Sequence, residues 1–325
     1  MKKLIAQAPD TVVVAEVPMP EMGPHDVLIR GVRSLISPGS ELNRVRRLPG
    51  DQDSKWPNHD LGYAIAGEIV EIGAEVTAWQ VGQRVVTMRH HQEYVVAPAA
   101  GDTIRQPKLI PDSVSWDDAP FIAWGCSCYN WTMQAGIKPG EQVAIVGLGL
   151  VGLLMAMWAR LRGPEQIIGL DLAQSRLDLA ARLGVDTLLN PGAGDAVEAV
   201  QAATAGRMAD CTLHCAAGPH VEAFELSQRI TRSGGRVVLI GIHSRPLTIL
   251  THEFLHKDLL GGGTNYQYDA SLYDLGARLI AAGKLPVGEI VTHNVPFTMG
   301  PEIYDMLNFR PQEAGAVLLR WEYEV

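Results

Sequence analysis

The sequence predicts an α/β protein in which a doubly wound parallel sheet is joined to a second, β-rich domain. Residues 141–241 alternate short apolar strands with amphipathic helices, as βαβ units do. The first 120 residues consist mostly of short strand-like runs separated by glycine, proline or charge. Strand-like sequence returns after residue 290. The two ends of the chain therefore share one character, and the middle has another.

In the β-rich part we expect strands at residues 26–36, 63–73, 83–88 and 92–98, and again at 290–297 and 314–321. Residues 36–43, ISPGSELN, read as a short polar turn. A helix is expected over residues 115–136, with Ser115 as its N-cap and Gly136 as its stop. Another helix is expected over residues 270–285.

In the α/β part the expected strands cover residues 141–147, 166–171, 186–190, 209–218 and 235–241. The expected helices cover residues 150–163, 173–184, 195–206 and 220–234. We place the α/β domain at residues 125–265 and the β-rich domain at 1–124 and 266–325.

Composition excludes several classes of protein. At 325 residues the chain can form two domains, and 47% hydrophobic against 19% charged residues is typical of a globular protein. A net charge of −9 argues against binding to nucleic acid or to a membrane surface. No apolar run reaches the roughly 18–20 residues that cross a bilayer, and the start lacks a secretory signal pattern. We expect a cytoplasmic protein that binds a small molecule.

The four cysteines, Cys126, Cys128, Cys211 and Cys215, lie in apolar segments without Cys-x-x-Cys spacing. In a chain without a secretion signal they are expected to be buried, reduced thiols.

The strongest motif is Gly147-x-Gly149-x-x-Gly152, which stands between a strand and a helix. The glycines permit a tight turn, backbone approach to a pyrophosphate, and close packing of helix on strand. Asp171 ends the next strand, where it would accept hydrogen bonds from an adenosine ribose and repel a 2′-phosphate. Its neighbour is Leu172, not arginine, which favours NAD(H) over NADP(H). The alternative is a tight strand–helix turn without a ligand.

Taken with VGQRVV, ITRSGGRVVLIG and ARLIAAGKL…IVTHNVPF, the motif resembles the medium-chain dehydrogenase/reductase family over nearly the whole chain. The resemblance implies a GroES-like catalytic domain from both chain ends, a central Rossmann domain, and a cofactor between them. It also implies a homodimer formed through the last Rossmann strand, near residues 259–264. The implied cofactor-binding residues are Gly147, Gly149, Leu150, Val151, Gly152, Asp171, Leu172, Arg176, Cys215, Ala216, Gly241, Ile242, Gly263 and Thr264.

Zinc-dependent members carry a cysteine, a histidine and a third donor at positions that here hold Pro38, Tyr63 and Ala123. Because none of these is a suitable zinc ligand, the resemblance implies a branch without catalytic zinc. The turn is similar to the Ser-x-Gly-x-Glu turn of the branch that contains bacteriochlorophyllide dehydrogenase, and the chain also resembles sugar- and cyclitol-pathway members. A different metal site remains open, built from His59, Asp60, His90, His91, Cys126 and Cys128.

The resulting hypothesis is a zinc-independent, NAD-dependent oxidoreductase that interconverts a secondary alcohol and a ketone on a polar substrate. Ser40, Tyr63 and His90 are the candidate catalytic residues. The candidate substrate-binding residues are Pro38, Asn43, Trp56, His59, Arg89, His91 and Trp124. Two other functions stay open, namely a zinc-free reductase of an activated C=C bond and an NAD(H)-binding protein that has lost catalysis. Tyr63 could also simply fill the vacated metal site, and residues 88–92 could be an ordinary exposed loop.

Overall fold

The computed structural model describes residues 1–46, 55–101, 104–218, 221–262 and 270–322. The chain divides into two compact units. We call Met1–Cys126 with Tyr266–Val325 the terminal unit, and Ser127–Asn265 the central unit.

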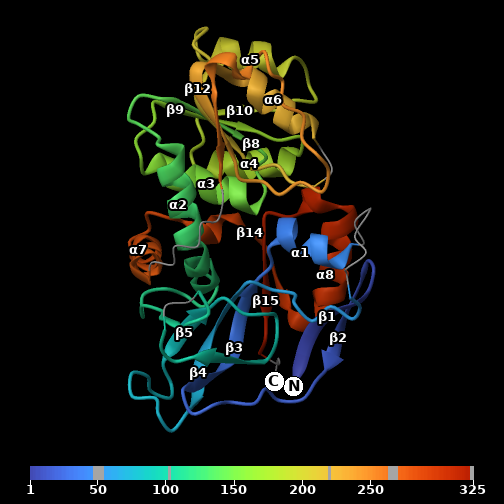
Figure 1. Cartoon of the computed structure of the whole chain (residues 1–325), viewed down its shortest axis with the longest axis vertical. Helices are drawn as coiled ribbons and strands as arrows, with labels where there is room; N and C mark the ends of the chain where they lie inside the picture. The colour runs from blue at the N-terminus through green and yellow to red at the C-terminus, as the bar shows by residue number, and fades with distance from the viewer. Residues whose placement is uncertain (47–54, 102–103, 219–220, 263–269, 323–325) are drawn as a thin grey trace. The chain divides into compact units, whose positions relative to one another are not determined.

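The central unit is a parallel sheet covered by helices on both faces (Figure 1). Its strands run in the order β10-β9-β8-β11-β12-β13. In chain order they are β8 (Gln142–Val146), β9 (Gln166–Leu170), β10 (Thr187–Leu189), β11 (Ala209–His214), β12 (Thr231–Leu239) and β13 (Asp258–Gly261). Helices α3 (Leu150–Arg160) and α4 (Gln174–Arg182) cover one face, and α5 (Ala196–Ala203) and α6 (Glu222–Ile230) cover the other. This is the doubly wound, Rossmann-type fold that the sequence predicts.

The strand order of this sheet reverses between β8 and β11, which both lie at its centre. All five residues of β8 are buried, as expected for a strand covered on both faces. Open α/β sheets bind ligands at the carboxyl ends of the strands, where the order reverses. We therefore expect a cofactor to bind at the loops after β8 and β11.

Strand β12 begins at Thr231, four residues before the strand expected from residue 235, so helix α6 is shorter than the predicted 220–234. Gly234 has a φ of 72°, which a right-handed helix excludes. The Thr231 hydroxyl donates to the Ser227 carbonyl at 2.7 Å and meets the Thr212 hydroxyl at 2.6 Å. These contacts end the helix and begin the strand.

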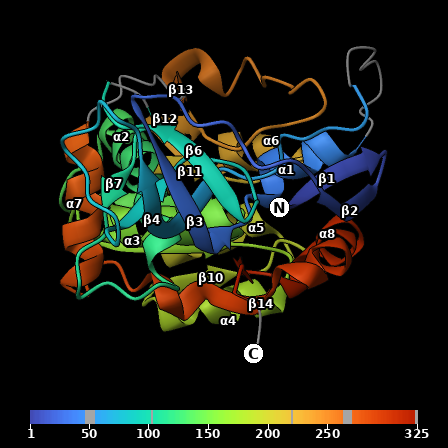
Figure 2. The ribbon, with the colours of Figure 1, turned by 90° about the horizontal axis from the view of Figure 1, so that it is seen from below.

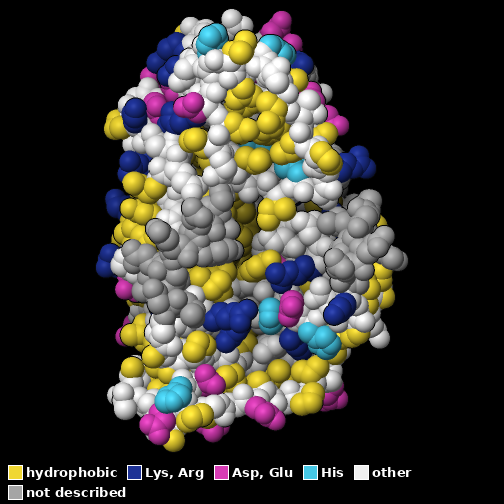
Figure 3. Space-filling model, viewed as in Figure 1, with side chains coloured by type: hydrophobic (Ala, Val, Ile, Leu, Met, Phe, Trp, Pro, Cys, Tyr) yellow, Lys and Arg dark blue, Asp and Glu magenta, His cyan; other side chains and the backbone are white. Residues whose placement is uncertain are grey.

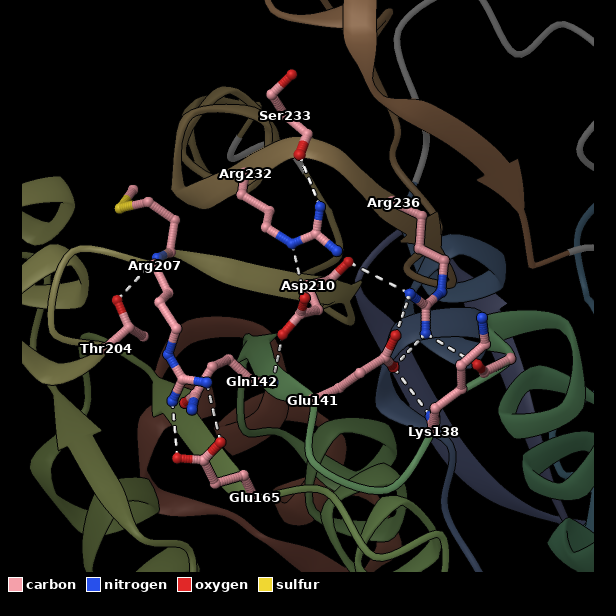
Figure 4. Close-up of polar contacts among 12 residues, drawn as sticks. Lys138, Glu141, Gln142, Glu165, Thr204, Arg207, Asp210, Arg232, Ser233 and Arg236 are labelled. Atoms are coloured by element: carbon pink, nitrogen blue, oxygen red, sulfur yellow. Dashed lines mark hydrogen bonds and ion pairs between the residues drawn. The ribbon is translucent and has the colours of Figure 1, made fainter.

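Ion pairs close the amino-terminal edge of this sheet (Figure 4). The Arg236 guanidinium binds Glu141, with an Nη2–Oε2 distance of 2.6 Å. Arg232 on the same strand binds Asp210 at 2.6 Å. The Asp210 carboxylate also accepts the backbone N–H of Gln142 at 2.7 Å, which ties β11 to the start of β8. The edge opposite the carboxyl ends is thus fixed by charge.

The terminal unit contains a curved sheet in the order β14-β15-β3-β4-β5-β7, with β6 paired to β3, and a separate β1–β2 hairpin. Figure 2 shows β3, β4 and β6 side by side, with α8 next to the hairpin. The strands are β1 (Lys2–Ala8), β2 (Thr11–Glu16), β3 (Asp26–Leu35), β4 (Ala64–Ile72), β5 (Arg84–Thr87), β6 (Tyr94–Pro98), β7 (Lys108–Leu109), β14 (Val291–Pro296) and β15 (Ala316–Arg320). The last strand, β15, pairs with β3, and β14 pairs with β15, so both chain ends build one sheet.

The segment expected to be a polar turn is a helix, α1 (Pro38–Val45). Proline is favoured in a first helical turn, where its missing N–H costs nothing. The Glu41 carboxylate accepts the Ser37 N–H at 2.6 Å, which satisfies a donor at the start of the helix. Leu42 and Val45 are buried on one side. The prediction of a turn was wrong: proline and Glu41 start a helix locally, and the burial of Leu42 and Val45 against the rest of the unit stabilises it.

The other helical segments depart from expectation at their ends. The predicted helix over 115–136 is a 3₁₀ helix, η1 (Ala119–Trp124), followed by α2 (Gly125–Ala135). Helix α7 covers Ala270–Ala281, and α8 (Gly300–Phe309) was not anticipated. Short 3₁₀ helices cover Phe254–His256, Val287–Ile290, Phe297–Met299 and Pro311–Glu313. Within the described ranges no helix is long and apolar enough to span a bilayer.

Candidate active site

The glycine motif forms a cradle at the carboxyl end of β8. Gly147 has a φ of 91°, which favours glycine. A Cβ on Gly152 would lie 1.9 Å from the Gly147 carbonyl oxygen, so only glycine lets α3 pack this closely. A Cβ on Gly149, by contrast, would meet nothing within 4 Å. Gly149 precedes α3, in which Leu150 is buried and Val151 half-buried. The open space in front of a helix N-terminus fits a pyrophosphate.

The Asp171 carboxylate is hydrogen-bonded to the backbone of this cradle. Its Oδ2 accepts the Leu148 N–H at 2.7 Å, and its Oδ1 accepts the Ala173 N–H at 2.8 Å. Each carboxylate oxygen retains a lone pair for a ribose hydroxyl. The Arg176 Nη1 lies 3.7 Å from Oδ2. Leu172 exposes 68% of its surface beside it, an apolar area that a planar base can cover.

The loops after β11 and β12 meet this cradle through their backbones. A Cβ on Gly147 would lie 2.6 Å from the Ala216 nitrogen, and one on Gly241 would lie 1.7 Å from the Ala216 oxygen. Cys215 is half-buried and Ile242 is 53% exposed. The predicted cofactor residues of the three loops therefore lie together. Gly263 and Thr264 fall outside the described residues.

A histidine pair at the same edge of the sheet was not anticipated. His214 Nε2 lies 2.8 Å from His243 Nε2, and His214 Nδ1 lies 2.9 Å from the Ser227 hydroxyl. His243 Nδ1 faces the Gly218 carbonyl at 3.1 Å. Burial, with a smaller contribution from His243, lowers the pKa of His214 to about 3. The pair links the loops after β11 and β12, and His214 is neutral at physiological pH.

In the terminal unit, a buried carboxylate organises the segment that carries Ser40. Glu41 Oε2 lies 3.1 Å from His91 Nε2 and accepts the Tyr304 hydroxyl, while Oε1 accepts the Ser37 amide. Glu41 and His91 are completely buried. Ser40, the residue before Glu41 on α1, is half-buried. This network fixes the first turn of α1, and with it the backbone of Ser40.

The hydrogen bonds of His91 continue from Glu41 to the C-terminal strand region. His91 Nδ1 lies 2.8 Å from the Ser34 hydroxyl, which accepts the Trp321 indole N–H at 2.8 Å. If His91 Nε2–H donates to Glu41, Nδ1 accepts the Ser34 proton and every group in the chain has a partner. Both ring nitrogens of the fully buried His91 are thus engaged in the interior, between Ser34 and Glu41.

Tyr63 lies under a guanidinium. The Arg44 Cζ stands 4.8 Å from the centre of the Tyr63 ring. Arg44 Nη1 also donates to the Asp60 carbonyl, which holds the guanidinium in place. A cation close to a phenol stabilises the phenolate relative to the neutral form. Arg44 was not singled out from the sequence, because only the helical form of α1 brings it to Tyr63.

His90 lies beside the Asp60 carboxylate, with 3.3 Å between Nε2 and Oδ1. Burial, followed by the Lys3 ammonium, lowers the pKa of His90 to about 4, and Asp60 only partly opposes this. A histidine with that pKa is neutral at pH 7 and is a weak proton acceptor. His90 is therefore less suited to be the base than the sequence indicated. Its Nδ1 is buried without a hydrogen-bond partner among the described residues.

The other candidate substrate-binding residues differ in their solvent exposure. Pro38, Asn43, Trp56, Arg89 and Trp124 are half-buried, and His59 is exposed. Of these, Pro38 and Asn43 share α1 with Ser40.

The residues at the expected ligand positions do not fit a catalytic zinc ion. Pro38 begins α1, Tyr63 is the phenol under Arg44, and Ala123 is a buried residue of η1. Proline and alanine offer no side-chain donor, and a neutral phenol is a poor ligand. Across the described part of the chain, no three His, Cys, Asp or Glu side chains are grouped so that they could hold a metal ion. No step of the chemistry below passes through a metal.

Comparisons with known proteins match both halves of the chain. Residues 23–106 match the alcohol dehydrogenase GroES-like domain, and residues 151–277 match a family described as zinc-binding dehydrogenase. An L-threonine 3-dehydrogenase of Symbiobacterium thermophilum is 29% identical over 307 residues, covering 86% of this chain and 87% of its own. A putative D-xylulose reductase of Agrobacterium fabrum is 28% identical, covering 85% of each chain.

Among solved structures, galactitol-1-phosphate dehydrogenase from Escherichia coli superimposes with a TM-score of 0.84 at 20% identity, covering 98% of this chain and 100% of that one. This likeness shows the same fold. Together, the GroES-like and Rossmann-type units, the glycine cradle and these relatives show that the chain belongs to the medium-chain dehydrogenase/reductase family, whose named relatives here are dehydrogenases acting on CH–OH groups.

Proposed function

We propose that the protein is a zinc-independent, NAD(H)-dependent oxidoreductase that interconverts a secondary alcohol and a ketone on a polar substrate, such as a sugar or cyclitol. One observation carries the proposal, namely a phenol under a guanidinium, Tyr63 under Arg44. The family resemblance implies that zinc-dependent members carry a ligand histidine at the position of Tyr63. The relatives named as threonine dehydrogenase and xylulose reductase support a secondary alcohol as the reacting group.

The bound nicotinamide would accept the hydride of the carbinol carbon and return it in the reverse reaction. The chain itself must then remove the hydroxyl proton or donate it to the ketone oxygen. We assign this proton transfer to the Tyr63 hydroxyl, since Arg44 favours the charged form that an efficient acceptor needs. Ser40 would donate a hydrogen bond to the same oxygen. Such donors stabilise a developing alkoxide most when water is excluded.

NAD(H) is proposed over NADP(H) because Asp171 places a carboxylate beside the expected ribose position. A 2′-phosphate would meet this charge at close range. The carboxylate is held by two backbone N–H groups, so it cannot easily turn away. Arg176 at 3.7 Å offsets the repulsion in part. We therefore expect a preference rather than complete exclusion of NADP(H).

A turnover assay tests the proposal. Purified protein is assayed with NAD⁺ on a panel of polyols, cyclitols and simple alkyl alcohols, and with NADH and NADPH on ketones and enones. Oxidation of a polyol with NAD⁺ that is lost in Tyr63→Phe is the expected result. The control, Tyr129→Phe, should keep this activity, because Tyr129 lies on α2 and packs edge-on against Trp158. Reduction of enones alone would favour the C=C reductase. Tight NADH binding without any turnover would favour a protein that has lost catalysis.

We also propose a homodimer formed through β13. This strand is the end strand of the central sheet, with Leu259 37% exposed on it. An uncovered edge strand invites pairing with another copy. Light scattering at micromolar concentration should give twice the chain mass, and a monomer there would contradict the proposal.

A further inference from the structure

Arg89 carries a charge that nothing in the described structure neutralises. It follows β5 at the start of the loop that also carries His90 and His91. Its side chain is half-buried, and its Nε is buried without a hydrogen-bond partner. No carboxylate among the described residues forms an ion pair with it. Burial lowers its pKa, and Arg105 lowers it further. An arginine this far from water normally has a partner.

The carboxylates of this region are already committed elsewhere. Asp26, which alone opposes the lowering, accepts the Gly23 N–H at 2.9 Å. Asp60 lies against His90, and Glu93 accepts the Lys2 amide. None of them is free to turn to Arg89 without breaking a contact that holds its own loop. Among the residues that the structure describes, no carboxylate is left to pair with Arg89, and we infer that a bound anion supplies the counter-charge.

Arg105 brings a second guanidinium close to the first. The Thr87 hydroxyl donates to the Arg105 carbonyl at 2.7 Å, which ties the loop before β7 to the end of β5. Arg105 is exposed, and its side chain makes no hydrogen bond or ion pair within the described ranges. In Figure 3, basic side chains gather with histidine and acidic ones in the region of β3 and β5. The charge of Arg105 is near enough to lower the pKa of Arg89, and an anion bound by both side chains would relieve this repulsion.

The loop that carries Arg89 is held firmly on its other side. The His91 N–H donates to the Leu61 carbonyl at 2.8 Å, and the His91 carbonyl accepts the Leu4 N–H at 3.0 Å. The His91 ring is locked between Ser34 and Glu41. A binding group on this loop is therefore preorganised, which reduces the entropy that binding must overcome.

We propose that Arg89 and Arg105 form a binding subsite for a phosphate monoester on the substrate. Two planar guanidinium groups match the geometry and the double charge of a phosphate monoester better than the single charge of a carboxylate. The inference rests on the proposed function in one respect: the phosphate belongs to the molecule whose alcohol is oxidised. Candidate substrates are then sugar or cyclitol phosphates.

The first test measures binding without turnover, so that its result does not depend on the catalytic proposal. Inorganic phosphate and acetate are titrated separately into the full chain by isothermal calorimetry at constant ionic strength. We expect phosphate to bind more tightly than acetate. Arg89→Ala and Arg105→Ala should each weaken phosphate binding by about 10- to 100-fold, as the loss of a charge-assisted contact does. Arg89→Lys keeps the positive charge but loses the planar guanidinium, so its phosphate affinity should lie between those of wild type and Arg89→Ala.

Arg30→Ala is the matched control, because Arg30 is an exposed arginine of the same unit that pairs with Glu68 at 3.3 Å. It should leave phosphate binding unchanged. If Arg89→Ala does not fold, the exposed Arg105 still allows the comparison. Equal phosphate binding by wild type and Arg105→Ala, acetate binding as tight as phosphate, or no saturable phosphate binding would each overturn the proposal.

The second test compares kcat/KM for matched polyols with and without a phosphate group. The phosphorylated member should be preferred in wild type and in Arg30→Ala, and the preference should fall by at least about 10-fold in Arg89→Ala. Phosphate binding without any preference for phosphorylated substrates would overturn the assignment to the substrate. Failure of every alcohol to react would instead contradict the proposed function and leave the binding result standing.

Discussion

Replacing Glu41 by glutamine should destabilise the terminal unit strongly, although the two side chains have the same shape. The carboxylate accepts three hydrogen bonds, from the Ser37 amide, the Tyr304 hydroxyl and His91. A glutamine has one acceptor oxygen and one NH₂ group, so its NH₂ must face at least one of these donors. An unsatisfied buried donor costs about 1–3 kcal/mol, and the remaining bonds lose their charge assistance. We expect a loss of about 2–4 kcal/mol.

The assay is urea unfolding followed by pulsed hydrogen exchange and mass spectrometry, which monitors residues 34–45 separately from residues 142–146. Only the first segment should lose protection at lower urea. Glu313→Gln is the control, since Glu313 is exposed and pairs with Arg310 at 3.2 Å, and such pairs contribute less than about 1 kcal/mol. If the free energy of unfolding of Glu41→Gln lies within about 0.5 kcal/mol of the wild-type value, the three hydrogen bonds assigned to Glu41 are wrong.

Three further predictions concern the central unit. Asp171→Ala should weaken NADH binding and reduce the bias against NADPH. Asp171→Asn keeps an acceptor for the Leu148 amide, so it should weaken NADH binding less. Tighter binding of NADPH than of NADH by the wild type would refute the role of Asp171 at the ribose. Burial lowers the pKa of His214 to about 3, so between pH 8 and pH 5 this histidine takes up a proton only in the unfolded chain, where its pKa is about 6.5. The free energy of unfolding should therefore fall by about 2 kcal/mol between pH 8 and pH 5, and by less in His214→Asn. The same pH dependence in wild type and variant would contradict this. Arg236→Met should destabilise the unit by about 1–3 kcal/mol, because it leaves the mostly buried Glu141 unpaired. Arg207→Met, which removes the exposed ion pair with Glu165, should change stability by less than about 1 kcal/mol. Equal effects of the two variants in urea unfolding would count against the role of burial.

The features that the sequence predicted well are those decided locally. Gly147 needs its positive φ and Gly152 packs against the Gly147 carbonyl within one strand–helix turn, so the glycine motif can be recognised without the rest of the fold. The alternation of strands and helices likewise predicts the doubly wound sheet, because each apolar strand must be covered on both faces.

The features that the sequence missed depend on distant partners. Helix α1 is held by Glu41, whose partner Tyr304 is 263 positions away along the chain. No local pattern distinguishes the buried His91 from the half-buried His90, and only the interior position of Ser34 and Glu41 explains why one turns inward. The contact between Arg44 and Tyr63 follows from the helix, so a turn at residues 36–43 could not predict it.

Proton transfer by Tyr63 without a metal is tested most directly by comparing turnover and metal content in one preparation. Metal content is measured by mass spectrometry before and after treatment with a chelator, and kcat is measured in wild type and Tyr63→Phe at both stages. We expect far less than stoichiometric zinc, a kcat that the chelator does not change, and a decrease in the kcat of Tyr63→Phe of about 10²–10³-fold with unchanged NADH binding. Stoichiometric zinc whose removal abolishes turnover, or full activity in Tyr63→Phe, would contradict it.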